Sequence, residues 1–218
     1  MIPLAESAPA CPLCESLSAF YHQDLRRTYY QCSHCALVFV LPGEFLTPLQ
    51  ERAEYELHRD APGDQGYRKF LSRMSEQIDI RVPPESHGLD FGCGPGPALS
   101  VVFEELGHAM AIYDPFFAPD RSVLDRTYDF VTATEVAEHL KDIRADLTLM
   151  WRCVRPGGYL GIMTKRVIDL AAFARWHYKD DRTHICFYST RTFSWLAEQW
   201  GTRPEFEGVD VVVFRKAT

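Results

Sequence analysis

Four apolar runs after residue 84 alternate with stretches whose apolar residues recur at helical spacing. The expected strands cover residues 87–91, 109–113, 129–134 and 159–164. The expected helices cover residues 97–106, 143–154 and 190–200, the last with Thr190 as N-cap residue and Gly201 at its end. Strands that alternate with helices form a parallel sheet, and such a sheet binds ligands at the carboxyl ends of its strands. The tail, residues 205–215, is typical of a closing hairpin. We therefore predict an α/β domain over residues 84–218.

Two helices are predicted between this domain and the N-terminal part of the chain. Thr47 and Pro48 are typical of a helix start, and that helix is expected to run to about His58. A second helix is indicated by apolar residues at i, i+3, i+4, i+7 and i+11, namely Tyr67, Phe70, Leu71, Met74 and Ile78. Its apolar face is expected to pack on the α/β domain. We assign residues 43–83 to a helical linker or cap.

Four cysteines near the N-terminus form two CxxC pairs. The pairs are Cys11 with Cys14 and Cys32 with Cys35, and residues 15–31 between them are enough for a β-hairpin. Four thiolates in this pattern supply the tetrahedral ligand set that structural zinc prefers, with no position left open for chemistry. A redox pair is disfavoured, because two copies face each other without a thioredoxin-like βαβ pattern. We predict a zinc ribbon over residues 1–42, too small to fold without its metal.

The first strand of the α/β domain leads into a loop with glycine at every second position. Asp90 lies near the end of the strand, and the loop contains Gly92, Cys93, Gly94 and Gly96. Glycine lets the backbone approach a ligand closely, and the helix behind the loop offers free N–H groups and a positive dipole. A dinucleotide-binding loop has the spacing GxGxxG and binds a pyrophosphate. A carboxylate at the strand end instead suits a cationic ligand that carries an amino group.

This loop resembles the first motif of the class I S-adenosylmethionine-dependent methyltransferases, an acidic residue followed by GxGxG. Asp114 ends the second strand, where this family places the carboxylate that binds the ribose hydroxyls. Residues 128–131 and 154–159 match the family's fourth strand and the turn before its fifth. The resemblance extends over most of residues 84–218, and it implies a Rossmann-like sheet and S-adenosylmethionine as methyl donor.

The resemblance also implies a set of cofactor contacts and one departure from the family's fold. The implied contacts are Asp90, Gly92, Cys93, Gly94, Gly96, Asp114 and Thr134, together with Tyr67, which either reaches the methionine end or only packs. Between Asp114 and Phe130 the family has a helix and a third strand, for which this chain is too short, so we expect a shortened crossover after the second strand. Phe116 or Phe117 of this segment either stacks on the adenine or belongs to the core.

The segment after residues 129–134 carries Glu135, Glu138 and His139, and His184 follows later. This pattern resembles the Glu-x-x-Glu-His element of the ubiquinone-pathway O-methyltransferases and of the small-RNA 3′-terminal 2′-O-methyltransferases. In the latter, such residues hold a divalent ion that binds the acceptor hydroxyls, which implies Mg²⁺ or Mn²⁺ at these four residues. Two alternatives stay open: His139 or His184 is a metal-free general base, or the residues form a structural cluster.

The residues also narrow the methyl acceptor. The chain lacks the Asn/Asp-Pro-Pro-Tyr segment of adenine amino-methylating enzymes and the Pro-Cys loop of cytosine C5 enzymes. The aromatic insertion 165–189 is expected to form the wall of the acceptor pocket. We predict methylation of a small molecule, at oxygen. The alternatives are an RNA or sugar-nucleotide methyltransferase, and a non-catalytic zinc-ribbon binding protein on a methyltransferase fold.

Composition adds limits on partners and location. A net charge of −7 disfavours a nucleic-acid partner, which would need concentrated Lys and Arg. No apolar run approaches the roughly 20 residues of a membrane span, and the N-terminus lacks the basic start of a signal peptide. We therefore expect a cytoplasmic protein that binds no membrane. The sequence does not indicate an oligomeric state.

Overall fold

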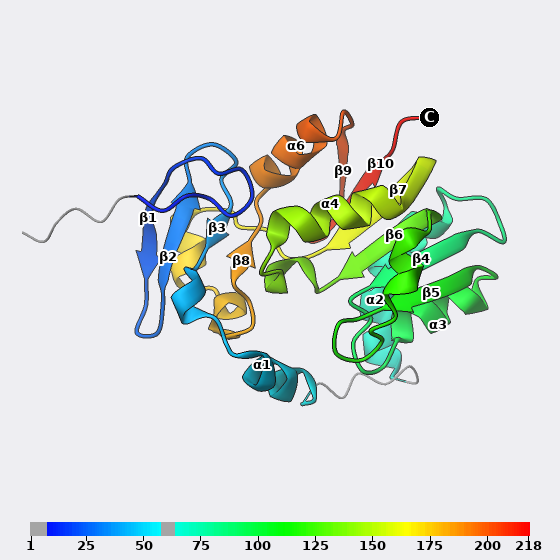
Figure 1. Cartoon of the computed structure of the whole chain (residues 1–218), viewed down its shortest axis with the longest axis horizontal. Coiled ribbons are helices and arrows are strands. Elements are labelled where there is room, and N and C mark those ends of the chain that lie inside the picture. The colour runs from blue at the N-terminus through cyan, green and yellow to red at the C-terminus, as the bar shows by residue number, and fades with distance from the viewer. Residues whose placement is uncertain (1–7, 58–63) are drawn as a thin grey trace, which may run out of the picture.

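The strands of the α/β part form one mixed sheet. A computed structural model describes residues 8–57 and 64–218, and in this part of the chain the strand order is β5-β4-β6-β7-β10-β9 (Figure 1). The strands are β4 (His87–Phe91), β5 (Ala109–Tyr113), β6 (Tyr128–Thr134), β7 (Val154–Met163), β9 (Pro204–Glu207) and β10 (Val211–Arg215). The first four are parallel and the last two antiparallel, so the predicted parallel sheet with a closing hairpin is confirmed.

The connection from β5 to β6 is short. It holds a single 3-10 turn, η2 (Arg121–Asp125), which begins where Asp120 accepts a hydrogen bond from the Ser122 amide at 2.9 Å. Pro115 and Pro119 have no N–H to donate, which disfavours a regular helix in this segment. β5 is the edge strand of the sheet, and the predicted shortened crossover is confirmed.

Helices cover both faces of the sheet (Figure 1). The helices of the described residues are α1 (Pro48–Tyr55), α2 (Gln65–Asp79), α3 (Ala98–Glu105), α4 (Ile143–Cys153), α5 (Leu170–Ala174) and α6 (Thr190–Gln199), of which α2 and α3 pack on one face and α4 and α6 on the other. The neighbours Phe130 and Val131 on β6 point to opposite faces, where Phe130 joins a core with α2 and α3 and Val131 joins one with α4 and α6. None of the helices in the described residues is long and apolar enough to cross a membrane.

Helix α2 packs on the sheet as its apolar pattern predicts. Leu71, Met74 and Ile78 are at most 1% exposed. Gly161 on β7 gives them room, since a Cβ at this position would lie 2.6 Å from Met74 Sδ. The predicted amphipathic helix is therefore confirmed.

Helix α1 starts at the predicted cap. The Thr47 side chain accepts a hydrogen bond from the Gln50 amide, and the Gln50 side chain accepts one from the Thr47 amide. The helix ends at Tyr55, and the predicted end, His58, lies outside the described residues. This short helix lies beside the carboxyl ends of the strands, where it contributes to the site described below.

Helix α6 lies at the predicted place but starts from a different cap. Thr190 was expected as the N-cap residue, and this is wrong by one position. The Ser189 hydroxyl accepts a hydrogen bond from the Thr192 amide at 3.1 Å, which satisfies a free N–H of the first turn. Gly201, with a φ of 65°, follows the helix end as predicted.

A second, smaller sheet is built from the N-terminal residues and one distant segment. Its strands are β1 (Ser18–Gln23), β2 (Thr28–Cys32), β3 (Val38–Phe39) and β8 (Cys186–Phe187). β8 belongs to the aromatic insertion and pairs antiparallel with β3, through Val38 with Phe187 and Phe39 with Cys186 (Figure 1). The insertion thus ties the N-terminal sheet to the α/β part.

Candidate functional site

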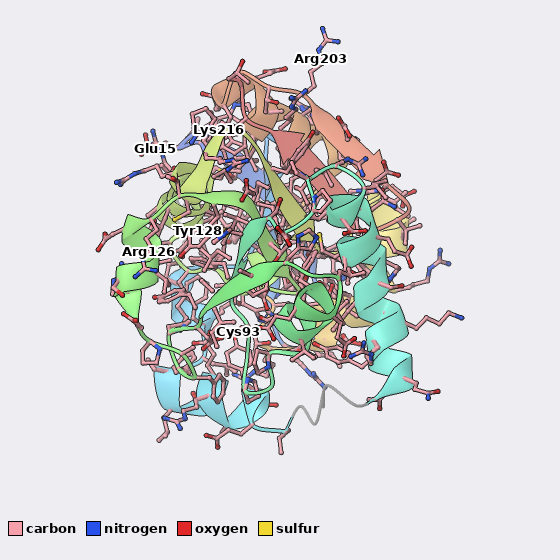
Figure 2. All side chains as sticks on the ribbon, turned by 90° about the vertical axis from the view of Figure 1, so that its right-hand side faces the viewer. Glu15, Cys93, Arg126, Tyr128, Arg203 and Lys216 are labelled. Atoms are coloured by element: carbon pink, nitrogen blue, oxygen red, sulfur yellow. The ribbon has the colours of Figure 1, made fainter. Side chains whose placement is uncertain are left out.

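A cavity of about 390 Å³ lies at the carboxyl ends of β4, β5 and β6. Its lining includes the predicted site residues Tyr67, Gly92, Cys93, Gly94, Gly96, Asp114, Thr134, Glu135 and His139. Three other predicted residues, Asp90, Glu138 and His184, lie outside this lining. Gly92, Asp114 and Thr134 lie at the carboxyl ends of β4, β5 and β6, and Figure 2 shows Cys93, beside Gly92, low in the view and far from Lys216, which follows β10. The cavity therefore occupies the edge at which parallel sheets bind ligands.

The glycine loop forms one wall of the cavity. Its first amides are fixed by β5, because the Gly92 and Cys93 N–H groups donate to the Tyr113 carbonyl at 2.7 and 3.2 Å. Gly92 has a φ of 79°, and a Cβ added there would lie 2.4 Å from a Val136 methyl group. Gly94 also has a positive φ, of 65°. The loop conformation thus requires glycine at both positions.

Asp114 connects this loop with the segment after β5. One carboxylate oxygen accepts a hydrogen bond from the Gly94 amide at 3.1 Å, and the other accepts from the Phe116 and Phe117 amides at 2.8 and 3.0 Å. Asp114 is buried, and its position in the cavity wall is fixed by these three donors. Phe116 and Phe117 line the same cavity, as expected if they contact an adenine.

Asp90 lies behind the cavity wall. Its carboxylate accepts hydrogen bonds from the Thr132 hydroxyl at 3.2 Å and the Ser100 hydroxyl at 3.4 Å. Burial raises the pKa of Asp90 to about 7. The carboxylate links β4, β6 and the start of α3, and the ligand contact predicted for Asp90 stays a prediction.

Helix α1 covers the cavity from outside the sheet. Tyr55 donates a hydrogen bond to Glu51 at 3.0 Å, and Lys141 forms an ion pair with the other oxygen of Glu51. The Tyr55 ring packs edge-on against His139, at 5.4 Å between centroids, and lies 5.9 Å from Phe116. Glu51, Tyr55 and Lys141 line the cavity but were missed by the sequence analysis, because a short helix of low amphipathicity carries no signal of a ligand.

Two glutamates lie on a strained turn after β6. Glu135 has a φ of 52°, a conformation that favours glycine. The Tyr178 hydroxyl donates to Glu138 and lies 3.4 Å from Glu135. The second carboxylate oxygen of each glutamate is buried and has no hydrogen-bond partner among the described residues. Burial, followed by the charge of Glu138, raises the pKa of Glu135 to about 8.

The two predicted histidines lie side by side, with ring centroids 4.7 Å apart. His139 Nδ1 lies 3.1 Å from the Thr183 carbonyl, and His184 Nδ1 lies 2.7 Å from the Tyr178 carbonyl. Because a carbonyl only accepts, Nδ1 carries the hydrogen in both rings and Nε2 is the acceptor nitrogen of the neutral form. Ligand atoms of Glu138, His139 and His184 lie within 4.8 Å of one another.

The predicted four-residue metal set is corrected by this geometry. Glu138, His139 and His184 form a group that could hold an ion, and Glu135 is not part of it. Glu135 instead faces the cavity of the glycine loop. The two glutamates of the Glu-x-x-Glu-His element are neighbours, since the Tyr178 hydroxyl contacts both, but only Glu135 lines the cavity.

The loop that carries His184 is held by the N-terminal sheet. Arg27, in the hairpin between β1 and β2, is 5% exposed. Its guanidinium donates to the carbonyls of Lys179, Asp181 at 3.0 Å and His184 at 2.7 Å. The sequence analysis found no role for this arginine.

The four N-terminal cysteines form a compact cluster of free thiols. Cys11 Sγ lies 3.6 Å from Cys35 Sγ, and Cys14 Sγ lies 3.3 Å from Cys32 Sγ. These distances are far longer than a disulfide bond and close to the roughly 3.8 Å that tetrahedral Zn–S bonds of about 2.3 Å imply. The chemistry and spacing of the donors therefore fit zinc.

Comparisons with known proteins support the fold and give the family. A family model described as a methyltransferase domain matches residues 55–204. A curated relative, the PKS-NRPS hybrid synthetase cheA of Chaetomium globosum, is 27% identical over 157 aligned positions, which take in 57% of this chain and 3% of the synthetase. The chain thus spans a small part of that relative's length.

Solved structures share the fold at low sequence identity. The 1,6-didemethyltoxoflavin-N1-methyltransferase of Burkholderia thailandensis has a TM-score of 0.56 and 15% identity, with 92% of this chain and 100% of that chain covered. A SAM-dependent methyltransferase of Archaeoglobus fulgidus has a TM-score of 0.53 and 16% identity, with 68% and 94% covered. An O-methyltransferase family protein of Burkholderia thailandensis has a TM-score of 0.53 and 13% identity, with 69% and 56% covered.

These matches confirm the resemblance that the glycine loop and Asp114 indicate. The family model takes in the glycine loop, Asp114 and the Glu-x-x-Glu-His segment, and thus the whole cavity wall built by the sheet. The chain belongs to the methyltransferase domain family.

Proposed function

We propose that this protein is an S-adenosylmethionine-dependent methyltransferase and that it methylates a small molecule at an oxygen atom. The observation that carries the proposal is one cavity with the glycine loop and Asp114 on one wall and Glu135 and His139 on another. A protein of the same fold was solved with 1,6-didemethyltoxoflavin and S-adenosylhomocysteine bound together, which supports a small-molecule acceptor. That protein is named as an N1-methyltransferase, so the choice of oxygen rests on the residues of this chain.

The residues of the cavity fit the methyl donor. S-adenosylmethionine supplies an electrophilic methyl group on a sulfonium ion. The backbone of Gly92 and Gly94 would hold its amino-acid part, since both residues line the cavity without a side chain. Asp114, fixed by three amide donors, would accept hydrogen bonds from the ribose hydroxyls. Phe116 and Phe117 would contact the adenine.

Glu135 is the group that we assign as general base. A hydroxyl loses its proton as the methyl group is transferred, and the best base has a pKa near the working pH. Glu135 lines the cavity, its pKa is raised to about 8, and one of its oxygens has no hydrogen-bond partner in the described structure. His139 lies on the same wall and is the alternative base, with Nε2 as acceptor nitrogen.

A divalent ion at Glu138, His139 and His184 is the alternative role of the cluster. Two imidazoles and one carboxylate suit Mn²⁺ better than Mg²⁺, which prefers oxygen ligands. The unpartnered Glu138 oxygen and the two Nδ1–H···O=C bonds support this site, since such bonds orient metal-ligating histidines. The ion would lower the pKa of an acceptor hydroxyl.

We further propose that the cysteine cluster binds a structural zinc ion and that residues 1–42 form the zinc ribbon. Glu15 and Ala36, which follow the two CxxC pairs, both have a positive φ, and their amides donate back to the Cys11 and Cys32 carbonyls. This repeated turn supports a pair of metal-binding knuckles. Residues 43–83 would serve as the cap over the α/β domain, with α1 and Tyr67 on the cavity. The free cysteines support a reducing, cytoplasmic location.

The alternative functions receive less support from the described residues. An RNA substrate would need exposed cations, whereas Arg27 of the Arg26-Arg27 pair is buried. A non-catalytic binding protein has no need of the buried, raised-pKa carboxylate that faces the cavity.

The function is tested by incubating the protein with methyl-labelled donor and a panel of small alcohols, phenols and matched amines. We expect label on hydroxyl compounds and a fall in kcat of at least about a hundredfold for Glu135→Gln, with unchanged donor affinity. Glu104→Gln, exposed on α3, is the matched control. Label on amines alone, or full activity of Glu135→Gln, would contradict the proposal.

A further inference from the structure

A second cavity, of about 780 Å³, shares no lining residue with the first. Its walls come from the N-terminal sheet, the insertion, the start of α6, the turn between β9 and β10, and α2. The charged residues among those that line it are Arg73, Lys165, Arg166, Arg191 and Asp210. Four cations therefore meet one carboxylate, in a chain whose net charge is −7.

Most of this positive charge is not neutralised by the protein. Asp210 is 2% exposed and forms an ion pair with Arg73. The Arg166 guanidinium instead donates to the Gly208 and Val211 carbonyls at 2.8 and 3.1 Å. The Arg191 guanidinium donates to the Ser33 carbonyl at 3.0 Å. Carbonyl partners fix a guanidinium in place without cancelling its charge, so the site stays cationic.

The remainder of the wall is apolar and aromatic. Phe173 and Trp176 line the cavity, together with Ile168 and Val209, whose side chains are 85% and 73% exposed. The first residues of α6, Thr190 and Arg191, lie on the same wall, so the positive end of the helix dipole adds to the charge of the arginines. A cavity of this composition suits a ligand with an apolar body and an anionic group.

The second cavity adjoins the proposed catalytic residues through Tyr178. Trp176 stacks on the Tyr178 ring at 4.9 Å, and Lys165 Nζ lies 5.0 Å from the centre of that ring. The Tyr178 hydroxyl contacts Glu138 and lies 3.4 Å from Glu135. Lys165 follows β7, and Glu135 follows β6, the neighbouring strand, whose main chain lies only about 4.8 Å away.

We propose that the second cavity binds the anionic end of the methyl acceptor, a carboxylate or phosphate on an apolar body. This inference rests on the proposed function, since it names the acceptor class of the same site. Arg191, Arg166 and Lys165 bind the anion, Trp176 packs on the apolar body, and the hydroxyl to be methylated lies toward Glu135.

The test uses an amphipathic anion as the probe. Binding of 8-anilinonaphthalene-1-sulfonate is measured by fluorescence, beside the neutral analogue N-phenyl-1-naphthylamine. We expect the sulfonate to bind at least about tenfold more tightly, inorganic phosphate to compete, and saturating S-adenosylhomocysteine not to displace it. Arg191→Glu and Lys165→Met should each weaken sulfonate binding by about tenfold or more while the neutral dye is unaffected. Equal binding of both dyes, or displacement by S-adenosylhomocysteine, would overturn the inference.

A matched control is Arg203→Glu, because Figure 2 shows Arg203 pointing outward from the molecule, and it lies outside the cavity lining. Sulfonate binding by this variant should equal that of the wild type, and a tenfold loss there would also overturn the inference. Calorimetry with S-adenosylhomocysteine on the same samples separates the two proposals. If S-adenosylhomocysteine binds but the two dyes bind equally, the proposed anionic acceptor is wrong and the proposed function stands. If the sulfonate dye binds more tightly than the neutral dye but S-adenosylhomocysteine does not bind, the proposed function is wrong.

Discussion

Arg27 donates a hydrogen bond of 2.7 Å to the main-chain carbonyl of His184, which lies 157 residues further along the chain. The same guanidinium reaches the carbonyls of Lys179 and Asp181. The N-terminal sheet therefore holds the loop that orients both histidines, since His139 in turn lies against the Thr183 carbonyl. Hydrogen bonds thus connect the N-terminal sheet directly to the loop that positions His139 and His184.

Replacing Arg27 should disturb this loop more than the donor cavity. Arg27→Gln leaves buried carbonyls without donors, which costs several kcal/mol in related cases, so we expect a lower melting temperature and a fall in kcat of at least about tenfold. Affinity for S-adenosylhomocysteine should change less than about threefold, because Arg27 does not touch the donor cavity. Arg203→Gln, at an exposed arginine that points outward from the molecule, is the control. A variant with unchanged kcat would contradict the coupling.

Zinc removal should act through the same contact. We expect about one zinc per chain by elemental analysis, and less than a tenth of that in Cys14→Ser/Cys35→Ser. The apo form should melt at a lower temperature, because the small sheet has too little core of its own. Cys153→Ser, at a cysteine outside the cluster, should keep its zinc. A fully active protein without zinc would be evidence against a structural ion.

Gly92 should be irreplaceable for geometric reasons. Gly92→Ala places a methyl group 2.4 Å from Val136 in a residue with a φ of 79°. Left-handed strain and overpacking together cost roughly 2–4 kcal/mol, so donor affinity should fall at least about tenfold. Gly43→Ala, where a Cβ has no neighbour within 4 Å, is the control. Val136→Ala added to Gly92→Ala should restore part of the affinity by titration calorimetry, and no recovery would contradict the proposed clash.

The buried carboxyl of Asp90 predicts a pH dependence of stability. Burial raises its folded-state pKa from 3.8 to about 7, so between these values the folded state holds a proton that the unfolded state has lost. This contribution to the free energy of unfolding is full below pH 3.8 and is lost as the pH rises through about 7. Thr132, Ser100 and the charge of Asp114 surround the group.

Asp90→Asn tests this assignment. The variant carries no proton to lose, so its denaturant-derived free energy of unfolding, relative to that of the wild type, should be higher at pH 8 than at pH 5. If the variant and the wild type differ in free energy of unfolding by the same amount at pH 5 and pH 8, Asp90 is not the group that titrates between these values. The exposed carboxylate Asp120, which is replaced in the control Asp120→Asn, lies outside this network.

Manganese binding separates the two roles of the histidine cluster. If Glu138, His139 and His184 hold an ion, zinc-loaded protein should bind Mn²⁺, observed by the loss of its free paramagnetic resonance signal. His184→Asn should weaken that binding by about tenfold and leave the zinc content unchanged. If the wild-type protein does not reduce the signal of free Mn²⁺, the cluster does not bind the ion and only the general-base role remains.

The sequence predicts the central sheet well because the inner strands β4 and β6 are almost fully buried and the strands are bounded by turn residues. The bounds expected for residues 87–91 and 109–113 are those of β4 and β5. The glycine loop and Asp114 are equally predictable, since loop geometry demands glycine and the strand end places the carboxylate at the ligand edge.

Other features depend on contacts that no local pattern encodes. β8 is only two residues long, and it is a strand because β3 lies beside it. Arg27 is charged and lies in a turn, which is typical of a surface residue, yet carbonyls from a distant loop bury it. Asp90 and Glu138 were expected at the ligand, and both are buried and absent from the residues that line the cavity.

Titration calorimetry with S-adenosylhomocysteine, on wild-type protein and on Asp114→Ala, tests the central claim most directly. We predict binding of one nucleoside per wild-type chain and at least about a hundredfold weaker binding by the variant, since the ribose hydroxyls would lose a charged acceptor fixed in the cavity wall. Wild-type protein that releases no heat, or a variant that binds as tightly as the wild type, would contradict the account.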